Sequence, residues 1–219
     1  MCEQAIDQLE SRLGPEHPDV GRALNTLAEL YRNEKQYEQA TLLYSRSLNI
    51  FEKALGTKDV QFAEALNNLA NVYSDWHKHQ EAIPLYMRAV DVQRQVLGMT
   101  HRNVAITLRN LGINHQEIGQ DIEALKAYQE ASTILTALLG AKNPEVKSLR
   151  RVIEYLKNEH RGEAFSSAMS KLKSSVRRAV PKLSLRRTKN ASKLKLLHSE
   201  LPAAVEDEEQ DEDTFDRDD

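Results

Sequence analysis

Three asparagines stand close together in the first half of the chain, Asn67, Asn68 and Asn71, within two turns of one predicted helix. Asn is unfavourable in a helix interior, by roughly 0.5 kcal/mol relative to Ala at each position. A carboxamide carries both a donor and an acceptor, which matches the peptide bond of an extended chain. The cluster is therefore interpreted in two ways: as a peptide-binding surface, or as solvated positions that keep an exposed helix face polar.

Other candidates for chemistry are weak. His77 and His79 flank Lys78 and offer two imidazoles, but the segment is a predicted turn and no third metal ligand is apparent. Trp76 is expected to cover that turn, and His115 to pack in an aromatic core position. The sequence contains no glycine-rich phosphate loop, nucleophile elbow or metalloprotease helix motif. We therefore predict no catalytic residue, no metal and no cofactor.

The composition favours a water-soluble, helical chain. The 219 residues have a formal net charge of -3, with 40% hydrophobic and only 5% aromatic residues, and the mean hydropathy is -0.60. Eight glycines and six prolines are few, so loops are expected to be short. No apolar run approaches the roughly 18 residues of a membrane span, and we expect no signal peptide. The single cysteine, Cys2, fits a reducing compartment.

A repeat of 42 residues runs through the chain. The dipeptide Leu-Gly recurs at positions 13–14, 55–56, 97–98 and 139–140. Inside each unit, apolar residues recur at i, i+3, i+4 and i+7 in two stripes separated by a short polar break, which predicts two antiparallel helices joined by a tight turn. Such a hairpin does not bury both faces alone, so neighbouring hairpins are expected to stack. The first helices share a column of small residues and the second helices an aromatic column: Ala28, Ala70 and Gly112, then Tyr44, Tyr86 and Tyr128.

The same register predicts the boundaries of the units. Asp59 and Asn143 are expected to be N-caps of first helices. Because Ile6 aligns with Leu48, the first residues are expected to hold the second helix of a preceding unit. We interpret the chain as a truncated product, an alternative start or the C-terminal portion of a longer protein. The expected divisions are a partial unit at 1–16, three full units at 17–56, 59–98 and 101–140, and a capping helix at 143–158.

These columns resemble the tetratricopeptide repeat (TPR). The first two units match its pattern at Leu27, Ala28, Tyr31, Ala40, Tyr44 and Ser47, and at Leu69, Ala70, Tyr73, Ala82, Tyr86 and Ala89. The third unit departs from the pattern at His115, where a Tyr is usual. The resemblance implies an all-α fold, a right-handed superhelix of antiparallel helix hairpins (a TPR solenoid).

The repeat length and the stretches at 13–20 and 65–73 look like the kinesin light chain and nephrocystin subgroup. That subgroup implies a non-catalytic adaptor or scaffold that binds an extended partner peptide in its concave groove. It also implies a cytoplasmic, cytoskeletal or ciliary location, in microtubule-based transport or ciliary assembly. No small-molecule substrate is expected.

In a TPR array the first helices line the concave face, and the resemblance points to asparagines at those positions. Arg22 and Arg109 would add a preference for acidic peptides, and no Lys occupies the positions that a carboxylate clamp uses. The predicted peptide-binding residues are Asn25, Asn67, Asn68, Asn71, Arg109 and Asn110.

The segment 159–200 is basic. Apolar residues at helical spacing before Pro181 predict a partly helical, amphipathic stretch, and its basic candidates are Lys171, Lys173, Arg177, Arg178, Arg186 and Arg187. It could bind an anionic membrane, tubulin tails, calmodulin or RNA, or be a solvated, disordered linker. A peripheral binder of anionic membrane or nucleic acid is therefore the alternative function. The acidic end at 201–219 is expected to be disordered, and to fold back on the basic stretch or enter the groove.

Overall fold

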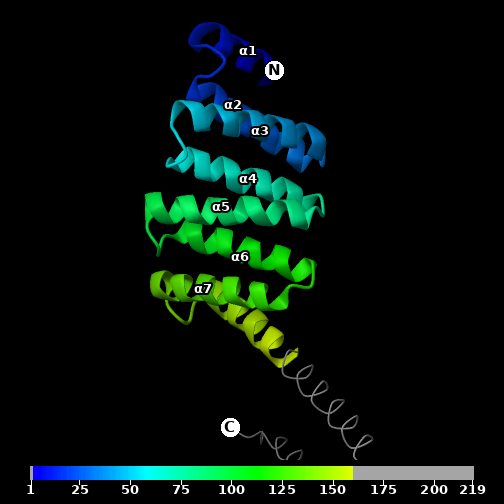
Figure 1. Ribbon diagram of the computed structural model, residues 1–219, viewed down its shortest axis with the longest axis vertical. Helices are drawn as coiled ribbons and strands as arrows, with labels where there is room; N and C mark the ends of the chain where they lie inside the picture. The colour runs from blue at the N-terminus through cyan, green and yellow to red at the C-terminus, as the bar shows by residue number, and fades with distance from the viewer. Residues whose placement is uncertain (1, 160–219) are drawn as a thin grey trace, which may run out of the picture. The chain divides into compact units, whose positions relative to one another are not determined.

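The computed structural model describes residues 2–159, which fold as a stack of helix hairpins (Figure 1). Within these residues there is no strand, and no helix is long and apolar enough to cross a bilayer. The predicted all-α solenoid of antiparallel hairpins is confirmed. α1 precedes three hairpins, α2–α3, α4–α5 and α6–α7, and the bounds in chain order are Cys2–Leu13, Pro18–Asn33, Tyr37–Ala54, Val60–Asp75, His79–Leu97, Arg102–Glu117 and Asp121–Leu139. A further helical segment covers residues 144–159.

Each first helix begins at a side-chain cap. The Asp59 carboxylate accepts a hydrogen bond from the backbone N–H of Gln61 at 2.7 Å, and the Asn143 carbonyl oxygen accepts one from Glu145 at 2.8 Å. Both caps were predicted. In the other two units a histidine Nδ1 takes the same role, because an unprotonated imidazole nitrogen also accepts an N–H. These histidines are His17 before α2 and His101 before α6.

The second helices pack their tyrosines against the small residues of the first helices. Tyr44, Tyr86 and Tyr128 are at most 3% exposed, and Ala28 and Ala70 are fully buried. A Cβ built on Gly112 would lie 2.7 Å from the ring of Tyr128, so this position has no room for a side chain. The predicted small and aromatic columns are thus confirmed as core.

Ion pairs join neighbouring second helices on their exposed side. Arg46 of α3 lies 2.6 Å from Glu10 of α1, and Arg88 of α5 lies 3.0 Å from Glu52 of α3. The next pair, between α5 and α7, has the opposite polarity, with Arg94 on the earlier helix and Glu130 on the later one. All six positions keep the 42-residue register.

Residues 160–219 lie outside the described part of the chain. What the sequence predicts for the acidic end, and for Lys171, Lys173, Arg177, Arg178, Arg186 and Arg187, therefore stays a prediction.

The close contact at Gly112 gives a test of the packing. We expect Gly112→Val to lower the free energy of unfolding by about 1–3 kcal/mol, because the Tyr128 ring must shift. Ile113→Val is the matched control, since the neighbouring Ile113 is 41% exposed and should change stability little. Urea denaturation measures the free energy of unfolding of both variants. Equal values for Gly112→Val and Ile113→Val would contradict the close contact between Gly112 and Tyr128.

Candidate functional site

The first helices α2, α4 and α6 present polar side chains on a common face, which we call the first-helix face. Hydrogen bonds join its neighbours across helices: Arg22 of α2 to Gln61 of α4 at 3.2 Å, and Thr107 of α6 to Asn67 of α4 at 3.1 Å. The positions that the repeat register predicts for this face are Arg22, Asn25, Thr26, Glu29, Arg32, Asn33, Glu64, Asn67, Asn68, Asn71, Ser74, Asp75, Ile106, Arg109, Asn110, Ile113, Gln116 and Glu117.

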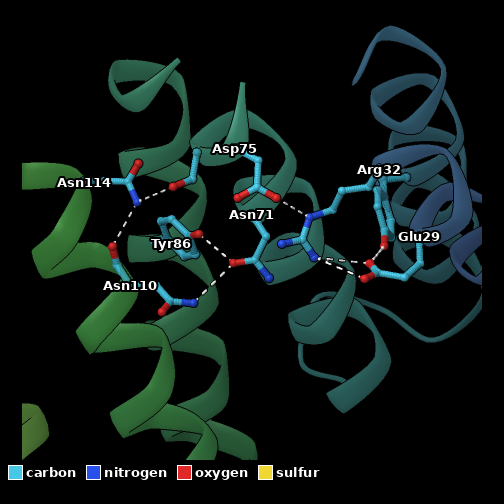
Figure 2. A network of polar contacts seen from close by, with 9 residues as sticks. Glu29, Arg32, Asn71, Asp75, Tyr86, Asn110 and Asn114 are labelled. Carbon is cyan, nitrogen blue, oxygen red and sulfur yellow. Dashed lines mark hydrogen bonds and ion pairs between the residues drawn. The ribbon is translucent and has the colours of Figure 1, made fainter. Parts of the chain in front are cut away.

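Asn71 of α4 and Asn110 of α6 lie side by side across the two helices (Figure 2). The Asn71 Oδ1 accepts two hydrogen bonds, from the Tyr86 hydroxyl at 2.6 Å and from the Asn110 Nδ2 at 3.3 Å. Among the described residues, the Asn71 Nδ2 and the Asn110 Oδ1 make no hydrogen bond. The pair therefore offers the NH2 group of Asn71 and the carbonyl oxygen of Asn110, and the other polar atom of each carboxamide is already hydrogen-bonded.

Asn114 of α6 is buried beside this pair and was not predicted as a site residue. It is 1% exposed, and its Nδ2 donates to the Asn110 backbone carbonyl at 2.9 Å and to the Ser74 hydroxyl at 3.0 Å. Its Oδ1 lies 2.8 Å from the Nδ1 of His79, which must carry the proton to donate. The repeat register could have predicted this residue. The preceding unit has the buried Val72 at the same position, so a polar residue there is expected to be buried and to need hydrogen-bond partners.

A second network links α2 to α4. The Arg32 Nε donates to the Asp75 carboxylate at 2.6 Å, and its Nη1 lies 3.3 Å from Glu29 (Figure 2). Burial alone would lower the pKa of Arg32, but the carboxylates of Asp75 and Glu29 outweigh it and raise the pKa. Glu29 also accepts a hydrogen bond from the buried Tyr44 hydroxyl at 2.7 Å. The charge of Arg32 is therefore neutralised by Asp75 and Glu29.

The arginines predicted to attract acidic ligands are also paired. Arg109 lies 3.0 Å from the carboxylate of Glu145, which also contacts Arg102 at 3.4 Å. Arg22 contacts the carboxylate of Asp19. The preference for an acidic ligand was predicted for free arginines, whereas in the structure these ion pairs neutralise the charge of Arg22 and Arg109 locally.

The other predicted residues have different surroundings. The Asn67 Oδ1 accepts the Thr107 hydroxyl, and the Asn25 Oδ1 is buried without a partner among the described residues. Asn68 lines a pocket of about 280 Å³ between the helices of successive hairpins, which we call the α4/α6 pocket. Its lining is Glu64, Asn67 and Asn68 of α4, Gln93 of α5, and Asn103, Ile106 and Thr107 of α6.

A larger pocket, of about 500 Å³, lies at the turns that end α2 and α4. His77 and His79 line it, and their ring centroids are 5.8 Å apart. Among the described residues, no group of three or more His, Cys, Asp or Glu could hold a metal ion. Trp76 stacks on Tyr37 with ring centroids 6.0 Å apart, and so covers the turn as expected.

His115 packs in the core as predicted. It is 9% exposed, and its Nδ1 lies 2.7 Å from the Oε1 of Gln120 at the start of the following helix.

A tetratricopeptide repeat family model matches residues 1–53 and 61–137 of this chain. No curated protein matches the chain. Among solved structures, BtubC (BKLC) from P. vanneervenii is similar, with a TM-score of 0.65 and 19% identity, covering 86% of this chain and 76% of that one. A putative kinesin light chain of Podosopora anserina with nearly identical TPR-like repeats has a TM-score of 0.65 and 21% identity, covering 81% and 86%.

A Rap protein complexed with Competence and Sporulation Factor is also similar in fold. Its TM-score is 0.52 at 18% identity, and the match covers 73% of this chain and 43% of that one. At these identities the likeness concerns the fold.

The Tyr86 hydroxyl ties the core to the first-helix face, which a conservative change can test. We expect Tyr86→Phe to lower the free energy of unfolding by about 1 kcal/mol, because the half-buried Asn71 Oδ1 loses its shorter hydrogen bond. Tyr155→Phe is the control, since Tyr155 is 56% exposed and should give a smaller loss. Denaturant titration measures the free energy of unfolding of both variants. Equal losses for Tyr86→Phe and Tyr155→Phe would contradict the role of the Tyr86 hydroxyl.

The buried phenols also predict a loss of stability at alkaline pH. Burial raises the pKa of Tyr44 and Tyr86, and raises that of Tyr128 to about 12. In an unfolded chain the tyrosine side chains have a pKa of about 10. Since the unfolded state then releases its protons first, the free energy of unfolding falls as the pH rises above about 10. Urea denaturation at increasing pH measures this, and Tyr86→Phe should reduce the slope; an unchanged slope would contradict the assignment.

Proposed function

This chain belongs to the tetratricopeptide repeat family, and from that premise we propose that it is a non-catalytic adaptor that binds an extended peptide of a partner protein along its first-helix face. The family generally provides protein-interaction scaffolds rather than enzymes. The similar Rap structure was solved with Competence and Sporulation Factor bound, which supports a binding role for this fold.

The observation that carries the proposal is the pair formed by Asn71 and Asn110. Their internal hydrogen bonds fix both carboxamides and leave the Asn71 NH2 group and the Asn110 carbonyl oxygen without a partner in the described residues. A peptide unit of an extended chain has the complementary acceptor and donor. Because both side chains are already ordered, the conformational entropy lost on binding is reduced.

Backbone recognition, rather than charge, is the main basis of this proposal. An acidic peptide would compete with Asp19 for Arg22 and with Glu145 for Arg109. The acidic character of the peptide therefore stays a prediction, and so does tubulin or membrane contact through the basic stretch.

For the biological setting we propose microtubule-based transport or ciliary assembly in the cytoplasm. The 42-residue repeat supports this through its resemblance to kinesin light chains and nephrocystin, and one similar fold carries the kinesin light chain name. The alternative function, binding to anionic membrane or nucleic acid, concerns residues outside the described part, and no contact within residues 2–159 favours it.

Asn71→Asp tests the proposal, because it keeps the Oδ1 acceptor used by Tyr86 and Asn110 and replaces the free Nδ2 donor by an oxygen. We expect peptides selected from a random library on the wild-type chain to bind the variant about tenfold more weakly. The measurement is fluorescence polarisation with the labelled peptides.

Asn49→Asp is the matched control, since it makes the same charge change at an exposed position of α3. It should leave the affinity unchanged. If the library yields no peptide, or if both variants bind as the wild type does, the proposal is wrong.

A further inference from the structure

The α4/α6 pocket carries an inference that deepens the proposed function and rests on it. We propose that this pocket accepts a basic side chain, best a guanidinium, of the extended peptide. The pocket lies on the first-helix face, and its volume of about 280 Å³ is open to a side chain that projects from a peptide on that face.

Gln93 places an unpaired carbonyl oxygen in the wall of the pocket. It lines the pocket from α5 and is 4% exposed, yet its Oε1 has no hydrogen-bond partner among the described residues. A buried carbonyl oxygen without a partner is unfavourable. A guest that brings N–H groups into the pocket satisfies it, whereas an apolar guest or an anion leaves it unpaired.

Glu64 supplies the charge. It lines the pocket from α4, is exposed, and makes no ion pair within residues 4–159. No Lys, Arg or His lines this pocket from α4, α5 or α6. The pocket therefore contrasts with the rest of the first-helix face, where Arg22, Arg32 and Arg109 each meet a carboxylate.

The remaining walls offer more acceptors. The carboxamides of Asn68 and Asn103 make no hydrogen bond to described residues, and the Asn67 carboxamide is held in place by the buried Thr107 hydroxyl. A guanidinium has five N–H donors in one plane and no acceptor, so it can contact several of these oxygens and the carboxylate together. An ammonium has three donors on one atom and reaches fewer of them.

Titration of the full chain with N-acetyl-arginine amide, followed by nuclear magnetic resonance, tests the pocket without a peptide partner. We expect saturable shifts of the Gln93 side-chain amide. N-acetyl-citrulline amide has nearly the same shape without the charge, and should bind about tenfold more weakly. Equal affinity for the two probes, or no binding of the arginine probe, would overturn the proposal.

Two variants locate the site. Glu64→Gln should weaken the arginine probe about tenfold, whereas Glu117→Gln should not change it, because Glu117 is a similarly exposed acid of the first-helix face that lines the other pocket. Gln93→Leu should also weaken the probe while keeping or raising the stability of the chain, since it removes an unpaired buried oxygen. If Glu117→Gln has the same effect as Glu64→Gln, the attraction is general and the pocket assignment is wrong.

The peptide selection separates this inference from the proposed function. If peptides bind and lose affinity with Asn71→Asp but show no basic residue at a fixed position, only the pocket assignment fails. If the arginine probe binds through Glu64 but no peptide binds, the adaptor proposal fails and the pocket remains.

Discussion

The buried tyrosine of each second helix is the constraint on which the rest of the structure depends. Its ring fills the space beside a small residue of the first helix, and its hydroxyl must still find an acceptor in an apolar setting. That acceptor comes from the first-helix face: Glu29 for Tyr44, Asn71 for Tyr86, and Gln116 for Tyr128. The packing of the core therefore also fixes the orientation of candidate binding residues on the first-helix face.

Much of this arrangement was predictable from the sequence, because it repeats. The small and aromatic columns and the caps Asp59 and Asn143 follow from local rules that apply to each unit separately. His17 and His101 were missed as caps, although they lie in the same column, because histidine is not among the usual capping residues.

The contacts between units were much harder to predict. Which side chain of α4 meets which of α6 depends on how successive hairpins stack, and the spacing within one hairpin does not contain that information. The pairing of Arg109 with Glu145 is an example, since the acid lies in the following helical segment. Asn114 is another, because it became interpretable only beside Ser74, Asn110 and His79.

These pairings change the meaning of the asparagine cluster, because polar residues on this face serve two purposes. Part of each carboxamide stabilises the stack, as the Asn71 Oδ1 does for Tyr86, so the presence of asparagine alone does not indicate a ligand. What distinguishes a binding group is the end that the stack leaves without a partner. Asn25, Asn67 and Arg109 occupy the same position in successive units, but their surroundings differ. The charge of Arg109 is neutralised by Glu145, the Asn67 oxygen accepts a hydrogen bond from Thr107, and the Asn25 oxygen is buried without a partner in the described residues. The groups that remain open, on Asn71, on Asn110 and in the α4/α6 pocket, all lie where α4 faces α6, so a ligand held there would bridge the second and third hairpins and stabilise their stacking.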